Sequence, residues 1–198
     1  MSDPRSAILI LAGGKSLRMG TDKTRLILQG KPLLRHLVDR LGTEAWDLFV
    51  AGGSSDHGLP ALPSEVRVFP DPKPNQGPLA AFAGFRDFAA SYDRILVLAC
   101  DLPFFQHTHA QALLTQSQED RTKGTPFFGS RAKAWIPVAE GRRQVLAGVY
   151  TSGAFLLAQE LFAKGERKMQ SFLDKIDFEL LPQEDEKPFQ NWNRPGDL

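Results

Sequence analysis

A loop rich in glycine and positive charge follows the first apolar run of the sequence. The aliphatic run 7–11 leads into the glycine pair 13–14, and the cations Lys15, Arg18 and Lys23 follow within nine positions. Glycines leave backbone N–H groups open to a ligand, and these groups attract anions, as does the N-terminus of a following helix. The composition of this loop is therefore typical of a site for phosphate groups.

Two common phosphate loops do not fit this spacing. Gly14-Lys15-Ser16 looks like the end of a P-loop, but that motif needs a glycine five positions before Gly14, where Leu9 stands. The dinucleotide pattern G-x-G-x-x-G also fails, because the glycines lie at positions 13, 14 and 20. A third kind of phosphate loop is needed.

A carboxylate stands at the end of another apolar run. Asp101 follows residues 95–100 without a spacer and precedes Leu102-Pro103, and proline cannot continue the hydrogen-bond ladder of a strand. A carboxylate beside phosphates is repelled unless a divalent cation lies between them, and Mg²⁺ commonly binds carboxylates together with phosphate oxygens. Asp101 is therefore a candidate ligand of Mg²⁺.

Short aliphatic runs alternate with helical stretches, a pattern that favours parallel βαβ units. The chain is expected to form a three-layer α/β sandwich around a mostly parallel sheet. Strands are expected over 7–11, 47–51, 65–69, 95–99, 133–138 and 146–150, and helices over 32–41, 77–91, 154–163 and 169–176. The strands 133–138 and 146–150 form a pair, and Pro137 places the first of them at a sheet edge or a bulge. Ligands of such sheets bind beyond the carboxyl ends of the strands.

Length and composition favour one domain without covalent cross-links. A chain of 198 residues, 42% hydrophobic, can bury about two thirds of its unfolded surface. The single cysteine, Cys100, permits no internal disulfide and matches a reducing compartment. The N-terminal apolar run is short for a signal peptide, and no stretch approaches the ~20 apolar residues of a membrane span. A cytoplasmic protein is expected, and the net charge of +1 argues against a nucleic-acid-binding face.

Five blocks of the sequence resemble one family. LAGGKSLRMGTDK, residues 11–23, closely resembles the signature L-A-G-G-x-S-x-R-M-G-x-D-K of the molybdenum cofactor guanylyltransferases, MobA-like members of the nucleotidyltransferase superfamily. LILQGKPLLRHLVDRL, DPKPNQGPLAAFAGF, ACDLPFF and NWNRPGDL resemble the family's later blocks in the family's order. The resemblance spans residues 11–198. It implies one Rossmann-like domain of the nucleotide-diphospho-sugar transferase type over 1–198, with a nucleotide half over about 1–105 and an acceptor half over about 106–198.

The resemblance also implies a reaction and a set of site residues. GMP would pass from GTP to molybdopterin with Mg²⁺ present, pyrophosphate would leave, and proteins that deliver the cofactor to molybdoenzymes would be further partners. Arg18, Lys23 and Asp101 match the catalytic positions, Asp101 also matches the magnesium ligand, and the pair Asn191 and Asn193 matches a block near the acceptor. The positions that match nucleotide contacts are Leu11, Ala12, Gly13, Gly14, Lys15, Lys23, Gly53, Asp71 and Asp101.

The sequence departs from the family pattern in two places, so two alternatives stay open. The family commonly has an asparagine after its second strand, where this chain has Gly52 and Gly53, and guanine would then be read by backbone groups. The stretch 143–150, RQVLAGVY, only approximates the family's Q-P-L-x-A-V-Y. The alternatives are a related nucleotidyltransferase, such as a molybdopterin cytidylyltransferase or one with another phosphate acceptor, and a catalytically silent nucleotide-binding accessory protein.

Other conspicuous residues have simpler structural interpretations. His107 and His109 are expected at the surface, because a spacing of two does not place them on one helix face for a metal. Asp71 could merely begin a turn before a proline. Cys100 and the tryptophans 46, 135 and 192 are expected in packing, and residues 182–188 in a solvated loop. The basic residues that could dock an acceptor phosphate, or could simply face solvent, are Arg142, Arg143, Arg167 and Lys168.

Overall fold

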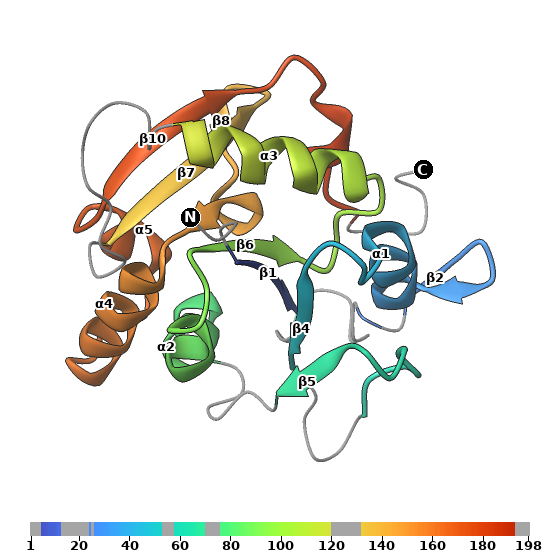
Figure 1. The fold of residues 1–198 in the computed structure, drawn as a ribbon, viewed down its shortest axis with the longest axis horizontal. Helices are drawn as coiled ribbons and strands as arrows, with labels where there is room; N and C mark the ends of the chain where they lie inside the picture. Colours follow the sequence, from blue (N-terminus) through green and yellow to red (C-terminus); the bar gives the residue numbers. More distant parts are fainter. Residues whose placement is uncertain are drawn as a thin grey trace.

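The computed structural model describes residues 5–12, 24, 26–52, 58–69, 76–119 and 132–192. In these parts, the main sheet has the strand order β10-β7-β9-β6-β1-β4-β5, with β8 beside β7 (Figure 1). Its strands are Ser6–Leu11 (β1), Asp47–Ala51 (β4), Arg67–Phe69 (β5), Arg94–Ala99 (β6), Lys133–Ala139 (β7), Arg142–Arg143 (β8), Val149–Tyr150 (β9) and Asp177–Pro182 (β10). A hairpin of Ile27–Leu28 (β2) and Lys31–Pro32 (β3) forms a second, two-stranded sheet.

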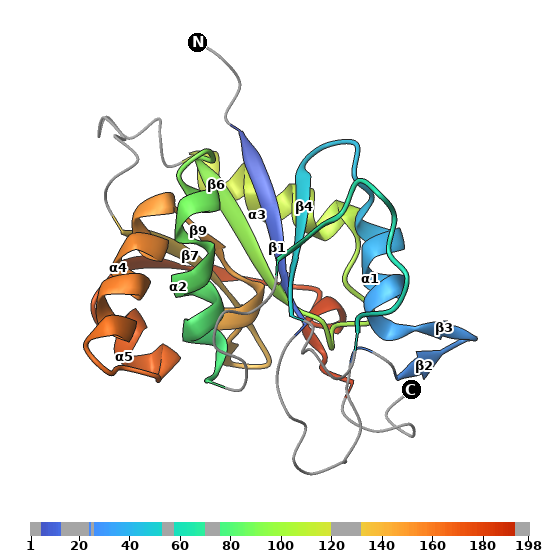
Figure 2. The same cartoon turned by 90° about the horizontal axis from the view of Figure 1, so that it is seen from below.

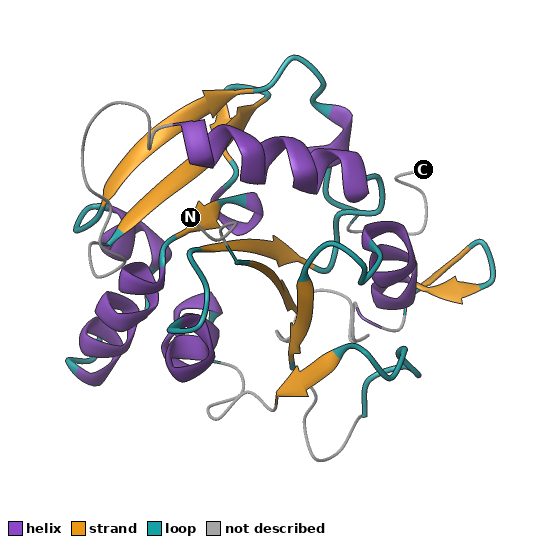
Figure 3. Ribbon diagram, in the orientation of Figure 1, coloured by secondary structure: helices purple, strands orange, loops and turns teal. Residues whose placement is uncertain are grey.

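Helices lie on both sides of the main sheet (Figure 3). They are Leu33–Leu41 (α1), Pro78–Ala89 (α2), His107–Glu119 (α3), Ser152–Ala163 (α4) and Met169–Leu173 (α5), with short 3-10 turns at Val145–Ala147 (η3) and Lys187–Phe189 (η4). Among the described residues, none of these helices has the length and apolar character that a membrane crossing requires.

The two faces of the sheet carry separate hydrophobic cores. Along β1, Ala7 and Leu9 pack with α2, α4 and α5, whereas Ile8 and Ile10 pack with α1 and α3 (Figure 2). A strand covered on both faces is apolar at every position, which explains the unbroken aliphatic run of β1. The predicted three-layer α/β sandwich is confirmed, and so is the prediction that 7–11 and 95–99 share a sheet, because β1 and β6 are parallel neighbours.

The order of the strands creates a switch point between β1 and β6. The chain passes from β1 to β4 and β5 on one side, and then crosses to β6 on the other side of β1. These four strands are parallel, whereas β9 runs antiparallel to both β6 and β7. In open α/β sheets a switch point of this kind opens a crevice at the carboxyl ends of the strands, where ligands bind.

The predicted pair of strands after residue 132 is confirmed, with two corrections. The strands pair antiparallel, with Trp135 opposite Val149, but residues 145–147 form η3, so β9 is shorter than expected. Pro137 is not on an edge strand, because β10 lies outside β7. At Pro137, the antiparallel partner of β7 changes from β9 to β8. The carbonyl of Pro137 accepts a hydrogen bond from the backbone N–H of Gln144 at 2.8 Å. The missing N–H of the proline therefore falls in a gap of the ladder.

Arg94 is buried at the start of β6. Its side chain donates to the carbonyl oxygens of Asp93 at 3.0 Å and of Ser117 at 3.2 Å, and Ser117 lies near the end of α3. The guanidinium carbon lies 4.4 Å from the ring centre of Trp135 on β7. Hydrogen bonds to carbonyl oxygens and a ring over the planar face both stabilise a buried guanidinium group. Arg94 therefore ties β6, α3 and β7 together at the amino end of the sheet.

Two histidines lie in the first turn of α3 and are more buried than predicted. His107 and His109 were expected at the surface, and both are half-buried. His107 donates from Nδ1 to the carbonyl of Leu41 at 2.9 Å, and its ring lies 4.5 Å from that of Trp46. Gln106 donates its backbone N–H to Nδ1 of His109 at 3.1 Å, in the manner of a capping box. Both histidines thus fasten α3 through backbone groups.

The cap by His109 makes the stability of the fold sensitive to pH. Burial lowers the pKa of His109 below the ordinary value of 6.5, although Asp185 acts in the opposite direction. The folded state disfavours the proton, so this contribution is complete above about pH 6.5 and is lost as the pH falls through the lower folded-state pKa. Relative to His109→Gln, which keeps a non-titrating acceptor, the wild-type chain should lose free energy of unfolding between pH 7.5 and 5. Urea denaturation of both proteins checks this, and parallel stability profiles would refute it.

Candidate functional site

Four parallel strands end at the same level of the sheet. The register pairs Leu11 with Ala51 and with Ala99, and Ala51 with Phe69. The segments that follow these residues therefore leave the sheet at one edge. By sequence, they carry the glycine and cation loop, the glycines after β4, the segment after β5 and Asp101. The carboxyl edge at the switch point is the candidate functional site.

Leu11 and Ala12 form the fixed base of the first loop. The backbone N–H of Ala12 donates to the carbonyl of Ala51 at 2.7 Å, and that of Cys100 donates to the carbonyl of Leu11 at 3.2 Å. Both Leu11 and Ala12 are buried. The loop that begins at residue 13 therefore leaves from a point that is bonded to the neighbouring strands on either side. Because their side chains are buried, these two residues could contact a ligand only through backbone groups.

Gly52 allows two strand ends to come close together. A Cβ at this position would lie 2.8 Å from the carbonyl carbon of Ala12, and the residue has a φ of +151°. Glycine tolerates both conditions. The sequence predicted a close backbone approach here for reading a base, and the approach that the structure contains is to the backbone of Ala12. Gly52 is thus explained by the packing of the loop base.

Asp101 is held on both sides by backbone contacts. Its carbonyl accepts a hydrogen bond from the backbone N–H of Trp192 at 2.8 Å, and its Oδ1 atom is buried. A turn follows, in which Phe105 donates to the carbonyl of Leu102 at 3.2 Å. Arg40 of α1 donates to the carbonyl of Pro103 in this turn at 2.8 Å. The carboxylate therefore extends from a backbone with little freedom.

The donor chemistry at this edge fits a magnesium ion. Asp101 supplies a carboxylate, the ligand type that Mg²⁺ prefers along with phosphate oxygens and water. Asp71 follows the last residue of β5 by two positions, as Asp101 follows the last residue of β6. Asp71 itself lies outside the described residues.

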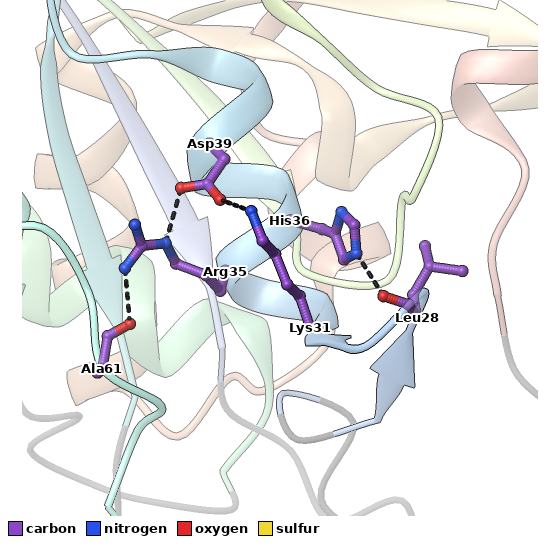
Figure 4. A network of polar contacts seen from close by, with 6 residues as sticks. All are labelled: Leu28, Lys31, Arg35, His36, Asp39 and Ala61. Carbon is purple, nitrogen blue, oxygen red and sulfur yellow. Dashed lines mark hydrogen bonds and ion pairs between the residues drawn. The ribbon is translucent and has the colours of Figure 1, made fainter.

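The hairpin β2–β3 is fastened to α1 by a polar network (Figure 4). Asp39 accepts from Arg35 at 2.7 Å and from Lys31 at 3.0 Å, and Nε2 of His36 contacts the carbonyl of Leu28. Burial opposes the charge of Asp39, but the hydrogen bonds from Arg35 and Lys31 outweigh it and lower the pKa of this carboxyl group. The hairpin follows residues 13–25 in the sequence, so the network fixes the point at which the chain returns from that segment.

Asn191 lies close to Asp101 along the backbone. Trp192, its neighbour in the sequence, bonds to Asp101, and the side chain of Asn191 is exposed. The structure therefore brings the backbone next to Asn191 to the peptide of Asp101. Sequence reasoning assigned Trp192 to packing alone, and its burial confirms that assignment, but its contact with Asp101 was missed. The position of Trp192 inside the block NWN was the available signal.

The predicted site residues fall partly inside and partly outside the described part of the chain. The described residues contain Leu11, Ala12, Asp101 and Asn191 of the predicted set. The predicted residues that lie outside the described ones are Gly13, Gly14, Lys15, Arg18, Lys23, Gly53, Asp71 and Asn193.

The four basic residues of the acceptor half are all exposed. Arg142 and Arg143 form β8, and the guanidinium carbon of Arg143 lies 5.0 Å from the ring centre of Phe178. Arg167 and Lys168 lie between α4 and α5. They are thus available to solvent and to an anion alike.

The loop around Arg167 lies near the start of α2. A Cβ on Gly77 would be 3.8 Å from the carbonyl oxygen of Arg167. Arg167 packs on the ring of Phe162 at 3.9 Å and donates to its carbonyl at 2.9 Å. The backbone N–H groups of Lys168 and Arg167 donate to the carboxylate of Glu166 and lower its pKa. These contacts order the cationic loop next to Gly77.

Comparisons with known proteins agree with this geometry. A probable molybdenum cofactor guanylyltransferase of Mycobacterium bovis is 33% identical over 194 residues, which is 96% of this chain and 90% of the relative. The crystal structure of molybdopterin-guanine dinucleotide biosynthesis protein A from Archaeoglobus fulgidus superposes with a TM-score of 0.70 at 20% identity, over 96% of this chain and 93% of that one.

A second solved structure has the same fold with another named substrate. The 2-C-methyl-D-erythritol 4-phosphate cytidylyltransferase of Thermus thermophilus superposes with a TM-score of 0.67 at 15% identity, over 96% of this chain and 93% of that one. The fold is therefore that of the nucleotide-diphospho-sugar transferases, as predicted. The model of the MobA-like NTP transferase domain matches residues 8–181. With this match over most of its length, the chain belongs to the MobA-like NTP transferases and is a nucleotidyltransferase.

Proposed function

We propose that this protein transfers GMP from GTP to molybdopterin, forming the guanine dinucleotide form of the molybdenum cofactor and releasing pyrophosphate. The observation that carries the proposal is the pairing of the ends of β1 and β6, which brings the base of the phosphate loop beside Asp101. The name and extent of the Mycobacterium bovis relative support the choice of substrates.

The chemistry requires positioning and charge neutralisation. An acceptor phosphate oxygen attacks the α-phosphorus of the nucleotide, the new P–O bond forms, and the bond to pyrophosphate breaks with the electron pair leaving on the pyrophosphate oxygen. Phosphoryl transfers of this kind depend mainly on preorganised charge and need no side-chain nucleophile. Mg²⁺, when held by Asp101 with Asp71 as a second candidate, would neutralise charge on the phosphate oxygens.

The chain's own residues divide this work by location. Lys15, Arg18 and Lys23 would neutralise the triphosphate, and Asn191 and Asn193 would contact the acceptor. We retain the division into a nucleotide half over about 1–105 and an acceptor half over about 106–198, with the exposed arginines of the latter available to the pterin phosphate. We also expect the reaction to take place in the cytoplasm, with delivery proteins for molybdoenzymes as partners.

The role of Asp101 predicts a large loss of turnover without loss of the fold. Asp101→Asn keeps the shape of the side chain but removes its charge. Removing one charge-stabilising group costs on the order of 100-fold in kcat in other enzymes, or about 3 kcal/mol of barrier. Pyrophosphate release from GTP and molybdopterin at limiting Mg²⁺ measures this. Asp87→Asn, an exposed change near the far end of α2, is the matched control and should leave kcat unaltered. Near-normal turnover in Asp101→Asn would defeat the assignment.

The choice of base distinguishes the proposal from its alternatives. A site matched to guanine leaves polar groups unpaired with other bases, and each such group costs roughly 1–3 kcal/mol. GTP should therefore exceed CTP and ATP by at least about tenfold in kcat/KM, because one decade corresponds to ~1.4 kcal/mol. Turnover with the three nucleotides is compared on molybdopterin. Equal rates with CTP would favour a cytidylyltransferase, and nucleotide binding without pyrophosphate release would favour an accessory protein.

Three glycine variants separate base reading from folding. Gly13→Val and Gly53→Val should reduce the preference for GTP, because a branched side chain would enter the space where backbone groups meet the base. Gly52→Ala should instead lower the Tm, because its Cβ would lie 2.8 Å from the backbone of Ala12. Thermal unfolding and the nucleotide series are measured on all three. An unchanged GTP preference in both valine variants would contradict backbone reading of the base.

A further inference from the structure

The residues after β10 cross the carboxyl edge of the sheet as a strap, which we define as residues 183–192 (Figure 1). At its start, the backbone of Gln183 donates to the carbonyl of Val138 at the end of β7, at 3.0 Å. Further along, the carboxylate of Glu186 accepts from the backbone of Glu140 at 2.7 Å. The predicted solvated loop over 182–188 is thus exposed in its acidic part but bonded to the turn after β7.

The middle of the strap packs on the turn that follows Asp101. The ring of Phe189 meets that of Phe105 nearly edge to face, with centres 6.0 Å apart. The ammonium group of Lys187 lies 4.8 Å from the ring centre of Phe104. Pro188 and Phe189 are both buried. The strap therefore packs closely against the turn 102–105, which follows Asp101 in the sequence.

Trp192 at the end of the strap makes two contacts of different kinds. Its backbone N–H donates to the carbonyl of Asp101 at 2.8 Å. Its indole ring is 96% buried and packs with Leu26, Leu28 and Leu33 at the base of the hairpin β2–β3. The backbone of Leu33 in turn donates to the carbonyl of Leu26 at 2.8 Å. One residue thus joins the peptide of the candidate metal ligand to the hairpin.

We propose that Trp192 is a positioning residue, which sets the distance between Asp101 and the base of the hairpin β2–β3. This inference rests on the proposed function, in which Asp101 and the cations of the segment 13–25 act on the same triphosphate. A displacement of about 1 Å in a catalytic group costs on the order of 100-fold in rate. Trp192 acts through the backbone of Asp101 and through the hairpin.

Phenylalanine is the conservative replacement at this position. Within the described residues, nothing accepts a hydrogen bond from the buried indole N–H of Trp192. Replacement by phenylalanine removes this polar group and keeps an aromatic side chain against the leucines, so the anchor remains. Trp192→Phe should keep kcat within about threefold of the wild-type value, whereas Trp192→Ala should lower kcat at least about tenfold.

The matched control is Trp46, which is buried beyond the C-terminal end of α1. Its indole N–H donates to the carbonyl of Gly42 at 3.2 Å, and its ring lies 4.5 Å from that of His107. Trp46→Ala removes a similar apolar volume from the core. Its kcat should stay near the wild-type value at a temperature where circular dichroism shows it folded, even if its Tm falls as much as that of Trp192→Ala.

The experiment measures kcat, the KM for GTP and the Mg²⁺ concentration for half-maximal rate in all three variants. The inference expects Trp192→Ala to lose kcat more than it raises KM, and to need more Mg²⁺. Equal kcat in the two alanine variants, or no recovery in Trp192→Phe, would overturn it. If Trp192→Ala does not fold, Trp192→Leu takes its place under the same criteria.

Hydrogen exchange provides a measurement that does not need turnover. Trp192→Ala should raise amide exchange in both 26–33 and 100–105, and Trp46→Ala should not. Absence of this paired increase would overturn the inference, even in an active enzyme. If the wild-type protein releases no pyrophosphate from any nucleotide, the proposed function fails, and the exchange result still decides whether Trp192 couples the two segments.

Discussion

The structure depends on four parallel strands that end in register, at the same edge of the sheet. The last residues of β1, β4, β5 and β6 stand opposite one another, and hydrogen bonds from Ala12 to Ala51 and from Cys100 to Leu11 continue the alignment past the strands. A shift of one residue in this register would turn every side chain of a strand to the other face of the sheet. Because separate cores cover the two faces, the register of the site is fixed by the packing of the whole sheet.

The sequence was informative where local composition decides the structure. β1, β4 and β6 were predicted to within one residue, because unbroken apolar runs bounded by glycine, aspartate and proline suit strands buried on both faces. α3 and β10 were not predicted. The buried face of α3 consists of Ala110, Leu113, Leu114 and Ser117. Because one of these residues is polar and one is small, the sequence of α3 shows only a weak apolar periodicity. β10 is an edge strand with Leu180 45% exposed, and it forms through pairing with β7, which no local pattern reports.

The same distinction applies to the site. Asp101 could be predicted, because its place after an apolar run and before a proline is a local signal. The contact between Trp192 and Asp101 could not be derived from residue types, since a backbone N–H is available at every residue except proline. The glycine at 52 was associated with a close approach to a base, whereas the approach in the structure is to the backbone of Ala12 and is a matter of tertiary packing. Sequence patterns thus identify the ends of the strands, and the fold determines what meets there.

Arg94 gives the sheet a second fastening, at the end opposite the strap. Its stack on Trp135 joins β6 to β7 across the two-residue strand β9, which is the narrowest ladder between the two sides of the sheet. Arg94 at one end of β9 and the strap at the other therefore both connect the two sides of the sheet. The entropy of bringing the two sides together is therefore lost during folding, and substrates meet walls that are already in place. The ordering cost of these walls is then met once, when the chain folds, and not again at each binding event.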